Sequence, residues 1–310
     1  MLTEKPYFTV HIEADFCAGY FLLNGQFLQS AEIAPVRSEQ PINHWVREGE
    51  NELLVMLGPV DEQGNFGQFS TLAKCQVTVK VRKSGSQSNE SLTIALLQFV
   101  AKDPTGIEGN TPEQLLDSKN GFAPGSSGDV RVGKTTREPF NEVGAIVKRS
   151  INLPELGLPE WSFFRSDNIT SLTGVDLEGR LDEAAMEQLQ QELLPVYRKI
   201  WNALDSNTVD EILPLFEERS REMDEAFFKS SGETQKRLAE VLNASVQDPD
   251  RKLWPITDDN VMVQPYDNNK LVRLSQNNGN PLLSFDYLSG GAKHFDVIFR
   301  KSGSQWIITR

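Results

Sequence analysis

The chain has 310 residues, 38% of them hydrophobic and 24% charged, a composition typical of a folded globular protein rather than a disordered one. Its 44 acidic and 31 basic residues give a formal net charge of −13, which disfavours nucleic acid and anionic membranes as partners because both repel a negative protein. No apolar run predicts a membrane span or a signal peptide, so we expect a soluble, cytoplasmic protein without membrane insertion, unless a leader has been removed.

The first part of the chain, residues 1–165, has the patterns of β-structure. Residues 7–15 alternate apolar and polar side chains, which is the period of a half-buried strand. Asn24 and Gly25 stand between two apolar runs and predict a two-residue hairpin turn, because both positions of that turn need a positive φ. Further short strands follow without amphipathic helices. The pattern predicts an antiparallel β-sandwich or jelly roll.

The chain has few residues suited to redox or metal chemistry. Its two cysteines, Cys17 and Cys75, are far apart and outside any C-x-x-C pattern, and without a visible export signal two free buried thiols are favoured over a disulfide. Whether they pair stays open. His11, His44 and His294 are scattered and form no H-x-x-x-H pair. We therefore expect no metal and no cofactor.

Two stretches of the first half carry a resemblance to known domains. YFLLNGQFL at 20–28, followed by INHWVREGENELLVML at 42–57, resembles the strands of β-sandwich domains of the sugar-binding, jelly-roll type. The resemblance implies a sandwich fold and carries no sugar site over to this chain. His44 and Trp45 are candidate ligand-binding residues, although a Trp beside a strand more often fills the core or rim.

Residues 103–142 form a long stretch rich in Gly, Pro, Asn and Ser, for which we expect an irregular loop. Within it, GDVRVGKT at 128–135 matches the phosphate-loop pattern G-x-x-x-x-G-K-S/T. A working phosphate loop needs an apolar strand before it and a helix beginning at the Lys-Thr pair. NGFAPGSSG cannot supply the strand, and Pro139 leaves too few residues for the helix. We therefore expect no nucleotide site.

Three basic side chains of the same stretch stay candidates for binding. Arg131, Lys134 and Arg137 form a small basic cluster in an otherwise acidic protein. If the cluster binds a ligand, we expect an anion or an acidic protein surface rather than ATP.

The second part of the chain has a different periodicity. Residues 166–180 are expected to form a linker, and the period changes to about 3.6 residues thereafter. Helices are predicted within 181–247 and strands within 260–309, the strands joined by Asn-, Gly- and Ser-rich hairpin connections. The predicted fold class is thus two domains, an antiparallel β-sandwich followed by an α+β domain at 181–310 with helices and then an antiparallel meander.

This second part also resembles a known fold. IWNALDSNTVDEILPLF at 200–216 resembles the helical opening of the cone-shaped α+β fold of nuclear transport factors and ketosteroid isomerases. That resemblance implies a pocket inside a curved sheet, where Asp286, Tyr287, His294 and Asp296 are candidates for acid–base chemistry. Strand alternation places Asp286 and Tyr287 on opposite faces, so they cannot line one pocket together. Asp286 and Asp296 could equally face solvent.

The functional expectation follows from the charge and from the lack of a convincing catalytic set. We expect a non-enzymatic protein-binding protein, such as an immunity-type neutralising protein or a scaffold, with a basic protein partner. The alternative is a small-molecule-binding or isomerase-like protein that uses a pocket of the C-terminal α+β domain. The sequence predicts neither the identity of the partner nor the oligomeric state.

Overall fold

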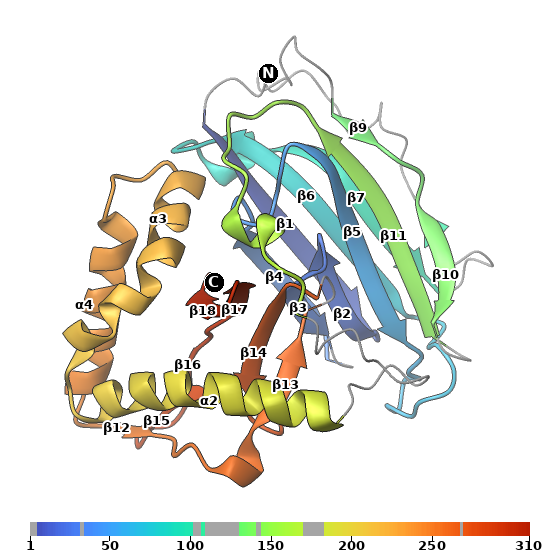
Figure 1. The fold of residues 1–310 in the computed structure, drawn as a ribbon. Helices are drawn as coiled ribbons and strands as arrows, with labels where there is room; N and C mark the ends of the chain where they lie inside the picture. Colours follow the sequence, from blue (N-terminus) through green and yellow to red (C-terminus); the bar gives the residue numbers. More distant parts are fainter. Residues whose placement is uncertain are drawn as a thin grey trace. The chain divides into compact units, whose positions relative to one another are not determined.

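The computed structural model describes residues 5–31, 34–101, 107–108, 130–140, 144–169, 183–266 and 269–310 (Figure 1). The chain divides into two compact units. The first comprises Met1–Glu160 together with Ala226–Phe228, and the second comprises Trp161–Glu225 together with Lys229–Arg310. The predicted fold class is confirmed, because antiparallel sheets fill the N-terminal half and helices followed by antiparallel strands fill the C-terminal half. Most of the expected linker, residues 170–180, lies outside the described residues.

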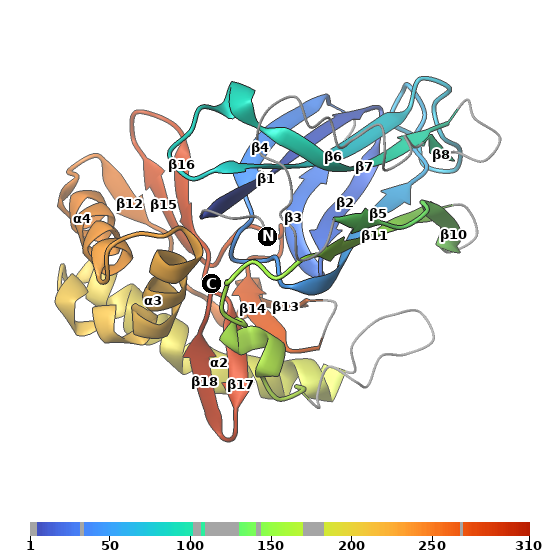
Figure 2. The same ribbon diagram turned by 90° about the horizontal axis from the view of Figure 1, so that it is seen from above.

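The first unit is built from two antiparallel sheets, which Figure 2 shows as two layers. In spatial order the first sheet contains β4 (Val36–Pro41), β1 (Pro6–Asp15), β6 (Lys74–Lys83), β7 (Leu92–Val100) and β8 (Ile107–Glu108). The second sheet contains β10 (Thr136–Phe140), β11 (Gly144–Leu153), β5 (Gly49–Gly58), β2 (Ala18–Leu23) and β3 (Gln26–Ala31), with β9 (Arg131–Val132) also paired to β11. A short 3-10 helix, η1 (Ser88–Glu90), precedes β7.

Alternation along the strands places the core of the first unit. Phe8, Val10 and Ile12 on β1 are all fully buried, as the period-2 pattern predicts. Leu53 and Leu57 on β5 are fully buried as well. Burying apolar side chains from strands of both sheets supplies the main stabilisation of such an architecture.

The predicted hairpin turn is confirmed. Asn24 and Gly25 have φ values of 54° and 72°, and they join β2 to β3. The Asn24 side chain also holds this turn to β5, because its Nδ2 donates to Asn51 Oδ1 at 2.8 Å and its Oδ1 accepts from the Glu52 N–H at 2.9 Å. The local preference of Asn-Gly for this turn and the hydrogen bonds from Asn24 to β5 therefore favour the same conformation.

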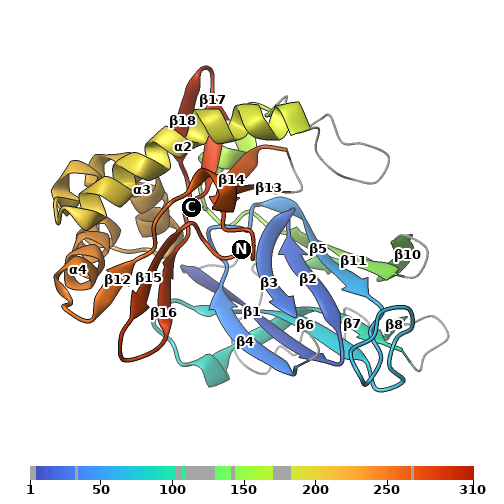
Figure 3. The ribbon, with the colours of Figure 1, turned by 90° about the horizontal axis from the view of Figure 1, so that it is seen from below.

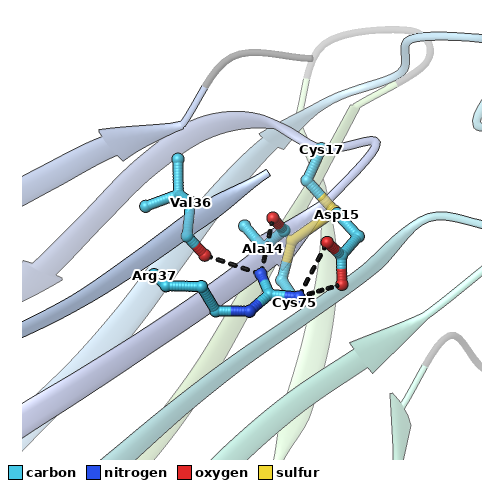
Figure 4. Close-up of a disulfide and its surroundings, with 6 residues drawn as sticks. All are labelled: Ala14, Asp15, Cys17, Val36, Arg37 and Cys75. Carbon is cyan, nitrogen blue, oxygen red and sulfur yellow. Dashed lines mark hydrogen bonds and ion pairs between the residues drawn. A yellow bond between two sulfur atoms is a disulfide. The ribbon is translucent and has the colours of Figure 1, made fainter. Parts of the chain in front are cut away.

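The prediction of two free thiols is wrong, because Cys17 and Cys75 form a disulfide (Figure 4). Antiparallel pairing of β1 with β6 places Ala14 directly opposite Cys75. Phe16 then takes a positive φ of 49° between β1 and β2, and Cys17 follows it with its Cα 6.7 Å from that of Cys75. Both cysteines are buried. The pairing depends on strand register, which two cysteines so far apart in sequence do not reveal.

An ion pair lies beside this disulfide at the end of β1. Arg37 on β4 donates through one nitrogen to both carboxylate oxygens of Asp15, at 2.7 and 2.8 Å (Figure 4). Its other terminal nitrogen donates to the carbonyls of Ala14 and Val36 at 3.2 and 2.7 Å. The place where the chain leaves the first sheet is thus held by a covalent bond and by a charged side chain.

The second unit combines helices with two small sheets. Its helical elements are η3 (Ser162–Arg165), α2 (Glu183–Asp205), η5 (Val209–Glu211), η6 (Leu213–Phe216), α3 (Glu217–Ala226), α4 (Glu233–Gln247) and η7 (Asp258–Asn260). One sheet contains β12 (Arg251–Leu253), β15 (Leu283–Tyr287) and β16 (Ala292–Phe295), and the other contains β13 (Met262–Pro265), β14 (Leu271–Ser275), β17 (Phe299–Ser302) and β18 (Gln305–Ile308). The hairpin β15–β16 pairs with β12, whereas β14 pairs with β17.

The core of the second unit lies between α2 and the strands, which Figure 3 shows beside that helix. Tyr197 on α2 is 1% exposed, and its ring lies 5.5 Å from that of Phe299. Its hydroxyl donates to the Val297 carbonyl at 2.7 Å and accepts from the Leu274 N–H at 3.0 Å. Burial raises the pKa of this phenol, so the hydroxyl stays protonated. Large side chains therefore fill this interior.

Among the helices that the structure describes, none has both the length and the apolar character that a membrane span requires.

Candidate functional site

Among the described residues, two hollows on the surface of the second unit are lined in part by the segment 254–260. The larger, which we call the α2 groove, has a volume of about 560 Å³ and is lined by Glu187, Gln190, Gln191, Leu194, Pro195, Arg198 and Asp258. The smaller, which we call the Trp254 hollow, has a volume of about 220 Å³ and is lined by Lys252, Trp254, Pro255, Thr257, Asn260 and Asp286.

Hydrogen bonds hold the start of the segment 254–260 in place. The N–H of Trp254 donates to the Ser284 carbonyl at 2.9 Å, which continues the ladder between β12 and β15. The indole N–H of Trp201, on α2, donates to the Trp254 carbonyl at 2.6 Å. Both backbone groups of Trp254 are therefore satisfied within the unit, while 36% of the residue remains exposed.

The end of the segment is held as well. Asp258 accepts a charged hydrogen bond from Arg198 on α2 at 2.5 Å. The Asn277 side chain donates to the Asp259 carbonyl at 2.9 Å, and the backbone N–H of Asn277 donates to Asn260 Oδ1 at 3.3 Å. The segment is thus fixed to α2 on one side and to a strand connection on the other. The part of each hollow that this segment lines is therefore held in a defined position.

The α2 groove is rich in hydrogen-bond acceptors. Helical spacing brings Glu187, Gln190 and Gln191 to one face of α2. Pro195 lies inside the helix and has no N–H, so position 195 supplies no helical donor for the Gln191 carbonyl. Among the described residues that line the groove, the one cation, Arg198, is already paired with Asp258. The groove therefore offers a carboxylate and amide oxygens to a donor-rich ligand.

The Trp254 hollow combines an aromatic ring with polar groups of both signs. Lys252 on β12 lies directly opposite Asp286 on β15. Asp286 is half-buried and Lys252 is exposed. Among the contacts of the described residues, neither side chain forms an ion pair, and the indole nitrogen of Trp254 has no hydrogen-bond partner. Such a hollow can accept and donate hydrogen bonds around an apolar surface.

Of the four acid–base candidates, Asp286, Tyr287, His294 and Asp296, only Asp286 is among the described residues that line either hollow. His294 is exposed on β16 opposite Ser284, and its Nδ1 lies 2.8 Å from Ser284 Oγ. The intervening Phe285 is fully buried in the core, with its ring 5.6 Å from that of Phe295. Alternation therefore turns Asp286 to the surface, away from the interior that Tyr197 occupies.

His44 and Trp45 lie in the first unit. Trp45 is only 7% exposed, and its carbonyl accepts a hydrogen bond from the Asn24 side chain at 2.8 Å. The ring of His44 lies 4.7 Å from that of Trp45 and 5.6 Å from that of Phe227, which belongs to the same unit. This arrangement suits a packing role for Trp45, the more frequent role for a Trp beside a strand.

Arg131, Lys134 and Arg137 are exposed. They lie on an extended part of the expected irregular loop, since β9 and β10 both pair with β11. The guanidinium of Arg137 lies 5.5 Å from the ring centroid of Phe99. Residues 128 and 129 lie outside the described residues, but no helix begins at Lys134, because β10 starts at Thr136. The local backbone is thus unlike that of a phosphate loop.

Arg149 follows the same cluster in sequence, yet its side chain is buried. Strand alternation on β11 turns Arg149 inward, at 3% exposure, where its Nε donates to the Gly133 carbonyl at 2.9 Å. A terminal nitrogen donates to the Leu96 carbonyl on β7, in the other sheet. Burial lowers the pKa of the guanidinium. Arg149 therefore ties the β9 segment to both sheets and is not available to a ligand.

The second unit contains a buried ion pair that sequence patterns did not indicate. Glu222 on α3 and Arg310 are 4% and 6% exposed, and their side chains are joined at 2.6 Å. Burial alone would raise the pKa of Glu222, but the Arg310 charge and the Ser162 N–H, which donates at 2.7 Å, lower it overall. The ion pair is buried away from solvent, which suits a structural role.

Among the described residues, no group of three His, Cys, Asp or Glu side chains is arranged to hold a metal ion. In comparisons with known proteins, no family model matches the chain, and no curated protein or solved structure is significantly similar to it. The resemblances to sugar-binding jelly rolls and to the nuclear transport factor fold therefore stay predictions.

The sequence did not single out the residues of either hollow other than Asp286. A usable signal was present in KLWPITDDN at 252–260, where a Trp precedes a Pro and two acidic residues outside any apolar periodicity. The sequence around Glu187, Gln190 and Gln191 contains no signal of the α2 groove, because the groove forms only where Asp258 approaches α2.

Proposed function

We propose that this is a non-enzymatic protein that binds a basic protein partner through the α2 groove. The observation that carries the proposal is the lining of this groove. Glu187 and the amides of Gln190 and Gln191 present acceptors, while the lining cation Arg198 is neutralised by Asp258. Lys and Arg side chains and backbone N–H groups of a partner segment are donors of the matching kind.

The charge around the groove supports the same partner. On residues 183–247, which include α2, α3 and α4, exposed carboxylates outnumber exposed cations. The whole chain has a net charge of −13, so a basic protein is attracted over a distance of about one Debye length, roughly 8–10 Å at physiological salt. An immunity-type or scaffold role is a finer form of this proposal and rests on the same charge.

The test is partner capture with matched charge-reversal variants. Glu187→Lys places a cation in the groove, whereas Glu211→Lys makes the same charge change at an exposed position outside the groove lining. Proteins captured from the source cells and released by raised salt are identified by mass spectrometry. The expected result is a basic protein that the wild type and Glu211→Lys retain and Glu187→Lys loses. Equal capture by both variants, or no basic protein released by salt, would overturn the proposal.

A second candidate function is the binding of a small molecule in the Trp254 hollow, which the half-exposed indole and the neighbouring Asp286 favour. An isomerase-like activity is not part of it, because Tyr197 and Phe299 fill the interior between α2 and the strands. The two candidates use different residues, so they can be tested separately.

A further inference from the structure

We infer that the Trp254 hollow is a subsite for one uncharged sugar ring. The inference rests on the second proposed function, the binding of a small molecule in this hollow, and names the class of that molecule. It does not depend on the α2 groove or on a protein partner. The ligand class follows from three properties of the hollow: its volume, its charges and its aromatic surface.

The volume suits a small ligand. At about 220 Å³ the Trp254 hollow lies below the roughly 300–1,000 Å³ of sites for drug-sized ligands. A single six-membered ring with its hydroxyl groups is of this smaller scale. Longer chains of rings could extend into solvent, because Lys252, Trp254 and Thr257 are all exposed.

The charges disfavour a ligand with a net charge. A cation would be attracted by Asp286 but repelled by Lys252, which lies directly opposite on the neighbouring strand. An anion would be attracted by Lys252 but repelled by Asp286. An uncharged polyol meets neither difficulty, because a hydroxyl group can donate to the carboxylate and accept from the ammonium. Asn260 and Thr257 add an amide and a hydroxyl of the same dual character.

The aromatic surface supplies the apolar contact. A sugar ring has one face made largely of C–H groups, and covering part of the indole with that face removes apolar area of both partners from water. Trp254 is 36% exposed, so such area is available. Its backbone is already held by Ser284 and Trp201, so little ordering of the chain is needed when a ligand binds.

The test is binding of simple glycosides to the full chain. Methyl glucoside, methyl galactoside, methyl mannoside and methyl N-acetylglucosaminide are titrated, and binding is followed by saturation-transfer NMR and by protection of tryptophan fluorescence from acrylamide. Trp254 is the most exposed tryptophan, so it dominates quenching. For a ligand of about a dozen non-hydrogen atoms we expect a dissociation constant on the order of 1 mM for at least one glycoside.

Variants locate the binding site. Trp254→Ala and Asp286→Asn are each expected to weaken glycoside binding about tenfold, whereas Trp254→Phe keeps an aromatic face and should stay within about threefold of the wild type. The matched control is Met262→Ala, since Met262 is 40% exposed on β13 but does not line the hollow. This control should bind like the wild type.

Two probes that are not sugars distinguish a failure of the sugar assignment from a failure of the second proposed function. Glycine and N-acetyl-arginine amide are titrated in the same way. Binding of these probes alone, lost in Trp254→Ala, would overturn the sugar assignment and leave the second proposed function standing. Binding of no probe would overturn both. Glycoside binding that survives Trp254→Ala would also overturn the inference, because the ligand would then occupy another surface.

Discussion

Removing the disulfide is expected to destabilise the first unit strongly. Cys17 and Cys75 are separated by 58 residues in sequence, so the bond closes a long loop in the unfolded chain. In the chain-entropy description, closing a loop of this length restricts the unfolded state by about 4 kcal/mol at 25 °C. For a unit of this size each kcal/mol changes the melting temperature by roughly 2–4 °C, so we expect a decrease of about 10 °C.

The assay is urea unfolding of the wild type and of Cys17→Ala, Cys75→Ala and the double variant, followed by fluorescence and circular dichroism. Each single variant already lacks the bond, so the double variant should lose little more than either single one. Dithiothreitol should destabilise the wild type and leave all three variants unchanged. Additive losses in the two single variants, or an unaffected wild type in reductant, would refute the reasoning. Non-reducing mass spectrometry of protein from its natural source tests the cytoplasmic location too, because stable disulfides are rare there.

Three further predictions concern buried or exposed polar groups. Tyr197→Phe removes the hydroxyl that donates to Val297, and should lower the unfolding free energy of the second unit by about 1–3 kcal/mol in urea titrations; no measurable loss would contradict the assigned hydrogen bond. Glu222 has a lowered pKa, so its contribution to stability is present above the unfolded value near 4.5 and is lost as pH falls. The melting temperature of the wild type should fall on acidification, and Glu222→Gln should reduce this dependence on pH. An equally steep pH dependence in the variant would show that other groups cause the acid sensitivity. Lys134→Ala should leave calorimetric titrations with ATP unchanged, and a weaker ATP signal in the variant would restore the phosphate-loop interpretation.

Several features were predictable because their causes are local in the sequence. The alternation that buries Phe8 and Ile12 and the turn at Asn24 depend on side chains a few residues apart, and the structure confirms both. Pro139 argued against a helix after Lys134, and the strand at residues 136–140 agrees. The sequence singled out Asp286 as a candidate residue, but it did not single out the other residues that line the Trp254 hollow.

Other features depend on strands and helices that are distant in sequence. Arg149 follows the basic cluster closely in sequence, but the register of β11 turns its side chain into the core. The hairpin β15–β16 looked like the middle of one meander, yet it pairs with β12. This pairing is what places Asp286 opposite Lys252 and next to Trp254, so the hollow exists only in the folded unit.

The sequence alone determined the order of strands and helices and the acidic character of the chain, since each depends on composition or on neighbours within a few residues. The tertiary structure alone decided that Cys17 and Cys75 pair, which charged side chains are buried, and where the hollows of the second unit form. The reason is physical: periodicity specifies which face of an element is apolar, whereas contacts across 58 or more residues depend on which strands share hydrogen bonds and in which register.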